Sequence, residues 1–128
     1  MIIADTSVWI AYQRDPASEI GSEFESLLIT GSIAMVGPVM AEILHGCRSD
    51  VEYDFYVGRL DGPQFLDTDQ ETWVLVGELG YRLKRHGVTV PFSDLVISAL
   101  AIQNGLPVYT LDEDFQRVPG LELYEPAQ

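Results

Sequence analysis

The chain has 128 residues, of which 47% are hydrophobic and 21% charged, and this composition indicates one folded domain over residues 1–128 and argues against a disordered protein. Its 20 acidic residues against 7 Lys and Arg give a net charge of −13, which argues against binding nucleic acid mainly through the protein's own cations. One cysteine and two histidines exclude an internal disulfide framework and a zinc site of nitrogen and sulfur ligands.

The apolar and helical patterns predict the following elements in chain order. We expect a strand at 2–4, helices at 7–13 and 17–29, a strand at 32–37, helices at 38–46 and 50–60, a strand at 65–67, helices at 69–86 and 94–103, a strand at 107–110, a turn or short helix at 112–115 and a last strand at 121–125. Ser93 is the expected N-cap of the helix at 94–103, and Gly105 its stop.

Strands alternate with helices, and the central strands are continuous apolar runs. This pattern predicts an α/β fold in which a parallel sheet of four to five strands is covered by helices on both faces. In the helix at 69–86, helical spacing assigns Trp73, Val76, Leu79 and Leu83 to the core.

We expect a cytoplasmic protein. The N-terminus lacks the basic start of a signal peptide. The longest uncharged stretch, 95–111, has 17 residues and contains Asn104, Gly105 and Pro107, so it is too short and too interrupted to cross a membrane.

Acidic residues follow the predicted strands at several separate places. Asp5 follows the first strand, Glu42 lies one turn into the helix after the second, Asp94 begins a very apolar helix, and Asp112 and Asp114 follow the strand at 107–110. Ligands of parallel sheets bind beyond the carboxyl ends of the strands, so these acids are expected to meet there. Like charges this close require a cation, and an all-oxygen ligand set favours Mg²⁺ or Mn²⁺ and hydrolysis of a phosphoester by an activated water.

Each acid also has a purely structural interpretation. Asp5 can be the N-cap of the helix that follows it, and Asp94 can complement the positive end of its helix. Asp112 and Asp114 can be turn residues. Glu42 would be costly to bury without a partner, unless it belongs to an exposed stripe.

Four segments together resemble a known family. The stretches "ADTSVWI", "AEILHG", "SDLVISALA" and "TLDEDF" look like the four acidic motifs of PIN-domain ribonucleases, and their order and the chain length are most similar to VapC-type toxins of bacterial and archaeal toxin–antitoxin systems. The resemblance covers nearly the whole chain. It implies a three-layer α/β/α PIN-like domain.

The resemblance also implies roles for individual residues. Asp5, Glu42, Asp94 and Asp112 would be the catalytic metal ligands, with Asp114 supporting or joining the site and the Ser7 and Thr110 hydroxyls bonding the carboxylates. The implied activity is that of a Mg²⁺- or Mn²⁺-dependent endoribonuclease acting as a toxin on single-stranded or loop RNA. The implied partners are a second copy in a homodimer and a VapB-like antitoxin.

Two questions stay open at this level. The cations Arg82, Lys84 and Arg85 either contact RNA or the antitoxin, or simply complement the end of their helix. The alternative to a nuclease is a catalytically silent PIN scaffold that binds a protein partner or RNA.

Overall fold

The computed structural model describes residues 1–126. Its elements in chain order are β1 (Ile2–Ala4), α1 (Thr6–Arg14), α2 (Glu19–Ile29), β2 (Ile33–Val36), α3 (Gly37–His45), α4 (Asp50–Arg59), β3 (Gln64–Leu66), α5 (Gln70–Arg85), α6 (Phe92–Asn104), β4 (Val108–Tyr109) and the 3₁₀ helix η1 (Glu113–Arg117). No helix within this part of the chain is long and apolar enough to cross a bilayer.

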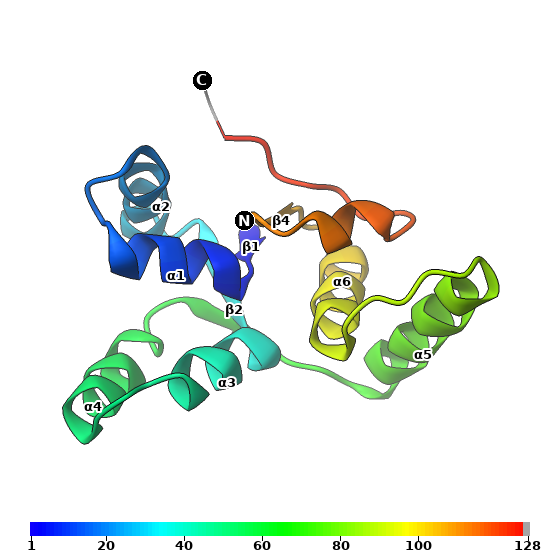
Figure 1. Cartoon of the computed structure of the whole chain (residues 1–128), viewed down its shortest axis with the longest axis horizontal. Coiled ribbons are helices and arrows are strands. Elements are labelled where there is room, and N and C mark those ends of the chain that lie inside the picture. The colour runs from blue at the N-terminus through cyan, green and yellow to red at the C-terminus, as the bar shows by residue number, and fades with distance from the viewer. Residues whose placement is uncertain (127–128) are drawn as a thin grey trace.

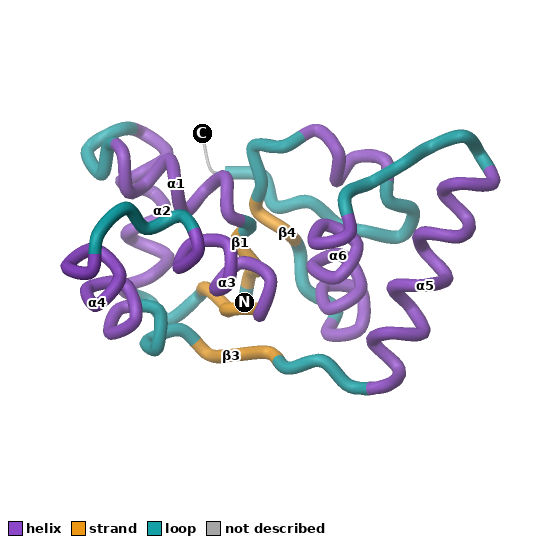
Figure 2. Tube along the Cα trace, turned by 60° about the horizontal axis from the view of Figure 1, so that its bottom comes forward, coloured by secondary structure: helices purple, strands orange, loops and turns teal. Residues whose placement is uncertain are grey.

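The strands form one parallel sheet in the order β3-β2-β1-β4. Parallel neighbours need crossover connections, and the helices supply them. In Figure 1, α1 and α2 lie on one side of the sheet, with α3 and α4 below them, and α5 and α6 lie on the other. The turned view shows β3 as the link that carries the chain from the α4 side to the α5 side (Figure 2). The predicted three-layer α/β/α fold is therefore confirmed.

The expected strand at 121–125 is wrong. This segment makes one bridge to the sheet, between Leu123 and Val108, so the sheet has four strands within the described residues. The Val108 N–H donates to the Glu122 carbonyl, and the Tyr124 N–H donates to the Val108 carbonyl. Because β4 is only two residues long, it offers no further backbone groups for a longer ladder.

The buried elements explain the apolar runs. All residues of β1 and β2 are buried, which explains why their sequences do not alternate between apolar and polar residues. In α6, every residue from Leu95 to Ala101 is buried, because this helix lies between the sheet and α5 (Figure 1). Edge strand β3 is more open, with Gln64 and Phe65 exposed.

The limits of α6 differ from the prediction at one end. The helix begins at Phe92, its N-cap is Pro91, and no side chain caps it, so the assignment of Ser93 as N-cap is wrong. The Pro91 carbonyl already accepts from the Leu95 N–H at 3.1 Å, which starts the helical ladder before Ser93. At the other end Gly105 adopts φ 65°, and its predicted role as the stop is confirmed.

The core face of α5 is rotated from the prediction. Its buried residues are Thr72, Val76, Leu79 and Leu83, whereas Trp73 is 48% exposed, so the core assignment of Trp73 is wrong. Adjacent residues of a helix point about 100° apart around its axis. The buried face of α5 includes Thr72, so the next residue, Trp73, points away from the core. The ring of Trp73 thus lies on the outer surface of the molecule.

Candidate active site

Asp5 joins the ends of β1 and β4. Ala4 pairs with Tyr109, so the next residues of the two strands, Asp5 and Thr110, leave the sheet side by side. The Asp5 side chain caps α1, because its Oδ1 accepts from the Ser7 N–H at 3.1 Å, more weakly from the Val8 N–H at 3.4 Å, and also from the Ser7 hydroxyl. Its Oδ2 accepts from the Thr110 hydroxyl at 2.7 Å. Asp5 is therefore both the N-cap and a link between two strand ends.

The same two hydroxyls hold the loop after β4. The Leu111 N–H donates to Ser7 Oγ at 3.0 Å, and the Asp112 N–H donates to Thr110 Oγ1 at 2.9 Å. Asp112 Oδ1 in turn accepts from the Asp114 N–H at 2.9 Å and caps η1. The predicted hydrogen-bonding role of Ser7 and Thr110 is present, and through the backbone it extends to the acidic loop.

Burial affects the charge of Asp5. The side chain is only 5% exposed, and this burial raises its pKa above 3.8, although the bonds from Ser7, Thr110 and Val8 act in the opposite direction. Both oxygens of Asp5 accept hydrogen bonds, as an ionised carboxylate does.

Three further carboxylates converge beside this link. Asp94, Asp112 and Asp114 each offer an oxygen, and these atoms lie within 4.8 Å of one another. The pKa of Asp94 is raised to about 7. Burial is the largest cause, and the negative charges of four acids add to it, in decreasing order Asp112, Asp5, Asp114 and Glu42. Every other acid that the sequence assigned to the site therefore raises the pKa of Asp94. The cluster of carboxylates resists full ionisation unless a cation neutralises it.

The structure distinguishes among the predicted ligands. Asp114, expected to support the site or join it, is a member of the group of three, whereas Asp5 and Glu42 are not. Glu42 is exposed, as are Ala41 and His45, so the interpretation of an exposed stripe on α3 is correct and Glu42 needs no buried partner. Glu42 lines a hollow between α1, α3 and α4 together with Arg14 and Arg48. Its charge nevertheless contributes to the raised pKa of Asp94.

The cations at the end of α5 are solvent-exposed. Arg82, Lys84 and Arg85 all lie in its last turn, where they complement the helix dipole. Arg82 Nε donates to Glu78 Oε1 at 3.0 Å. This is the one ion pair within residues 1–126, so in that part of the chain no Lys or Arg neutralises the acidic site.

The donor set fits a hard divalent cation. Every candidate ligand is a carboxylate oxygen, and three of them converge without a cationic side chain of the described residues in ion-pair contact. Mg²⁺ and Mn²⁺ prefer such ligands, and Mg²⁺ is commonly held by few carboxylates together with water and substrate phosphate.

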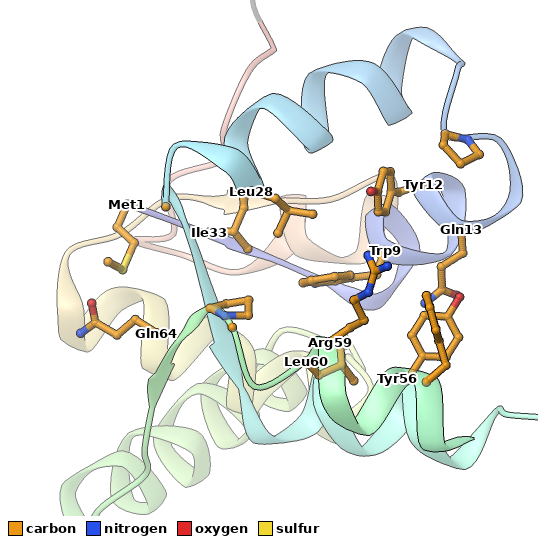
Figure 3. Close-up of a pocket in the computed structure, with 15 residues that line it drawn as sticks. Met1, Trp9, Tyr12, Gln13, Leu28, Ile33, Tyr56, Arg59, Leu60 and Gln64 are labelled. Carbon is orange, nitrogen blue, oxygen red and sulfur yellow. The ribbon is translucent and has the colours of Figure 1, made fainter. Parts of the chain in front are cut away.

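Sequence reasoning missed a second hollow, which lies between α1, α2 and α4 and is lined by the side chains in Figure 3. Trp9, Tyr12 and Gln13 of α1 face Tyr56 and Arg59 of α4 across it. Its residues come from distant parts of the chain and carry no common motif, so no local pattern in the sequence indicated the pocket. None of the acids of the candidate site lines this pocket.

The chain is similar in sequence to known proteins. The PIN domain family model matches residues 2–121. Ribonuclease VapC11 of Mycobacterium tuberculosis is 34% identical over 119 residues, which span 90% of this chain and 89% of that protein. Ribonuclease VapC18 of the same organism is 30% identical over 121 residues, covering 91% and 86% of the two chains.

Solved structures show the same fold. A chain in the crystal structure of VapBC2 from Rickettsia felis, bound to a DNA fragment from its promoter, superimposes with a TM-score of 0.81 over 97% of this chain and 98% of the other, at 24% identity. With a family model that covers nearly the whole chain and relatives at 30% identity or more, the chain belongs to the PIN-domain family, and its relatives are VapC ribonucleases.

Proposed function

We propose that the protein is a metal-dependent endoribonuclease and the toxin of a toxin–antitoxin pair. The observation that carries the proposal is the convergence of Asp94, Asp112 and Asp114 within 4.8 Å at the carboxyl edge of the sheet. The relatives named ribonuclease supply the substrate class, RNA.

In this proposal Asp94, Asp112 and Asp114, together with Asp5 and Glu42, hold Mg²⁺ or Mn²⁺. When bound, the ion supplies the positive charge that docks an RNA phosphate, activates water and stabilises the leaving oxygen. The protein itself contributes the arrangement of the acids, since carboxylates fixed before the substrate arrives need little reorganisation during the reaction.

The hydroxyls of Ser7 and Thr110 position the acids in this scheme. Each hydroxyl donates to Asp5 and accepts a backbone N–H of the loop that carries Asp112. The hydroxyls thereby fix the position of Asp5 relative to the loop that carries Asp112. Neither hydroxyl needs to touch the substrate to affect the rate of cleavage.

The excess of 13 negative charges makes the ion important for substrate binding as well. An acidic surface repels phosphates, so the bound cation provides a local site of opposite charge. The exposed cations Arg82, Lys84 and Arg85 are the proposed further contact, either to the RNA backbone or to the antitoxin.

Two protein partners complete the proposal. A VapB-like antitoxin is supported by the relatives' names and by similar chains that occur in VapBC complexes. A homodimer is supported by an exposed aromatic patch where α5 meets α6: the rings of Trp73 and Tyr81 on α5 and of Phe92 on α6 line one pocket. A toxin of this kind would meet its RNA in the cytoplasm.

The test is cleavage of a labelled, mixed RNA pool by the purified protein with Mn²⁺ or Mg²⁺, with chelator, and with the Asp94→Asn variant. The proposal expects cleavage that requires the metal and is lost in the variant, while Asp61→Asn, an equal change of charge at an exposed position, retains it. Metal-independent cleavage, or equal cleavage by Asp94→Asn, would contradict the proposed site.

The same samples distinguish the nuclease from a silent scaffold. A scaffold would remain folded yet cleave nothing, and Mn²⁺ would not raise its melting temperature. A nuclease with a narrow substrate range would be stabilised by Mn²⁺ even if the pool lacked its target.

A further inference from the structure

The hollow between α1, α3 and α4 adjoins the candidate active site. It encloses about 690 Å³, and its lining includes Glu42, whose charge contributes to the raised pKa of Asp94. Of its 12 lining residues, only Glu42 belongs to the proposed metal site. An RNA strand with a phosphate at the cation can therefore continue into this hollow, and the other lining residues are placed to contact it.

Two arginines in this lining are available to bind an anion. Arg14 ends α1 and Arg48 lies in the loop before α4, and they are two of the chain's seven Lys and Arg residues. Both are exposed, and no carboxylate of the described chain forms an ion pair with either. Glu42 and Glu52 also line the hollow, but a cation bound at Glu42 would leave two arginines against one acid. Guanidinium groups bind phosphate through paired hydrogen bonds.

An aromatic ring and a buried donor lie in the same lining. Phe55 is 50% exposed and meets the Tyr56 ring edge-on, with the centroids 5.2 Å apart. The Arg59 guanidinium lies over the Phe55 ring at 4.6 Å but lines only the other pocket, so it does not cover the ring from within this hollow. The Gln13 side-chain N–H is buried and has no acceptor within residues 1–126, and Figure 3 shows Gln13 reaching from α1 toward Tyr56.

We propose that this hollow is the subsite for the nucleotide next to the scissile phosphate. The base of that nucleotide stacks on Phe55, and the Gln13 N–H donates to an acceptor on its edge. Arg14 and Arg48 bind the neighbouring phosphates. The position of the scissile phosphate rests on the proposed function, and the subsite adds residues that select the RNA sequence. Stacking accepts every base, so the preference for a particular base comes from Gln13.

The combination of groups favours single-stranded RNA over other occupants. An acidic peptide would satisfy the two arginines, but it would not account for the position of the hollow beside the acids that hold the cation. Duplex RNA keeps its bases stacked inside the helix and cannot place one on Phe55. A single strand supplies phosphates and an unstacked base together.

The test measures RNA binding by the full chain with Mn²⁺ at low salt, using fluorescence anisotropy. The probes are labelled octamers of A, C or U with 2′-O-methyl riboses, and an abasic octamer with the same number of phosphates. A gel of each sample checks that the octamers stay intact. Comparing base-containing with abasic octamers separates the stacking of bases from the binding of phosphates.

The proposal expects the natural chain to bind at least one base-containing octamer about tenfold more tightly than the abasic octamer. Phe55→Leu should abolish this difference and leave the affinity for the abasic octamer unchanged. Gln13→Met should change the order of affinities among the A, C and U octamers. Arg14→Gln and Arg48→Gln should weaken binding of every octamer and each lower the salt dependence by about one charge. Arg117→Gln removes the same charge from an exposed position outside the hollow and should change neither quantity.

Other results would overturn the inference. Equal affinity of the natural chain for abasic and base-containing octamers, or an unchanged difference in Phe55→Leu, would remove the stacking site. An equal loss in Arg117→Gln would assign the effect of the two arginines to overall charge. Displacement of every octamer by an octapeptide of Glu, at the concentration at which the abasic octamer displaces them, would assign the hollow to a protein.

Repeating the titrations with Asp94→Asn separates this inference from the proposed function. The variant should bind all octamers more weakly, yet keep the tenfold difference between base-containing and abasic octamers. If Asp94→Asn loses RNA cleavage while Phe55→Leu binds as the natural chain does, the nuclease stands and the subsite is wrong. If no protein cleaves RNA but the difference persists and depends on Phe55, the subsite stands and the nuclease is wrong.

Discussion

Replacing Asp94 by Asn tests whether the clustered acids repel one another in the metal-free protein. Burial and four neighbouring acids raise the pKa of Asp94 from 3.8 to about 7. Between these two values the native state keeps a proton that the unfolded chain has lost, so the stability that the proton confers is lost as the pH rises toward 7. Asn has nearly the same shape and no charge, and should remove this dependence.

The size of the effect follows from the pKa and the exposure. If Asp94 were fully shielded from solvent, a pKa change from 3.8 to about 7 would lower the free energy of unfolding by about 4 kcal/mol above pH 7. Asp94 is only partly buried, and solvent screening reduces the expected gain of the Asn variant to about 1–2 kcal/mol. For a chain of 128 residues this corresponds to a melting temperature about 4–8 °C higher.

The assay is urea unfolding in chelator at about pH 5 and about pH 7.5. The gain in free energy of unfolding of Asp94→Asn over the natural chain should be largest at the higher pH. Mn²⁺ in place of the chelator should stabilise the natural chain and not the variant. Asp61→Asn removes the same charge from an exposed position outside the cluster and should change little. If Asp94→Asn destabilises the protein at the higher pH, or if Asp61→Asn gives an equal gain, repulsion within the cluster is refuted.

Three further changes test other parts of the structure. Thr110→Val should lower stability by about 1–3 kcal/mol in a urea titration and reduce RNA cleavage, because it removes the bond to Asp5 and the acceptor of a loop N–H. Charge reversal of Arg82 and Arg85 should weaken RNA or antitoxin binding measured by titration; unchanged binding of both at low salt would leave these residues their helix-dipole role alone. Trp73→Ser should shift sedimentation from dimer toward monomer, and an unchanged dimer would exclude this face of α5 as the contact.

The sequence was most informative about the buried centre of the fold. Continuous apolar runs at β1 and β2 predicted strands covered on both faces, because only a central parallel strand must be apolar at every position. The run at 121–125 failed for a long-range reason: its pairing depends on the length of β4, which nothing within the run itself encodes.

Surface positions were harder to predict. Trp73 and Thr72 are neighbours in sequence, and hydrophobicity favours the Trp for the core, yet the packing of α5 against α6 buries the Thr. For Glu42, the sequence left burial and an exposed stripe as alternatives, and the structure shows the exposed stripe. In both cases the choice of face is made by the neighbouring element, which local periodicity cannot include.

Asp5 shows why the capping and the functional interpretation of an acid need not compete. A carboxylate has two oxygens, and here Oδ1 accepts from the first turn of α1 while Oδ2 accepts from Thr110 at the end of the adjacent strand. The cap fixes the direction of the side chain, and that direction brings Asp5 close enough for its charge to raise the pKa of Asp94. Local helix capping thereby orients an acid at the edge of the sheet where, in the proposed function, a cation must be held.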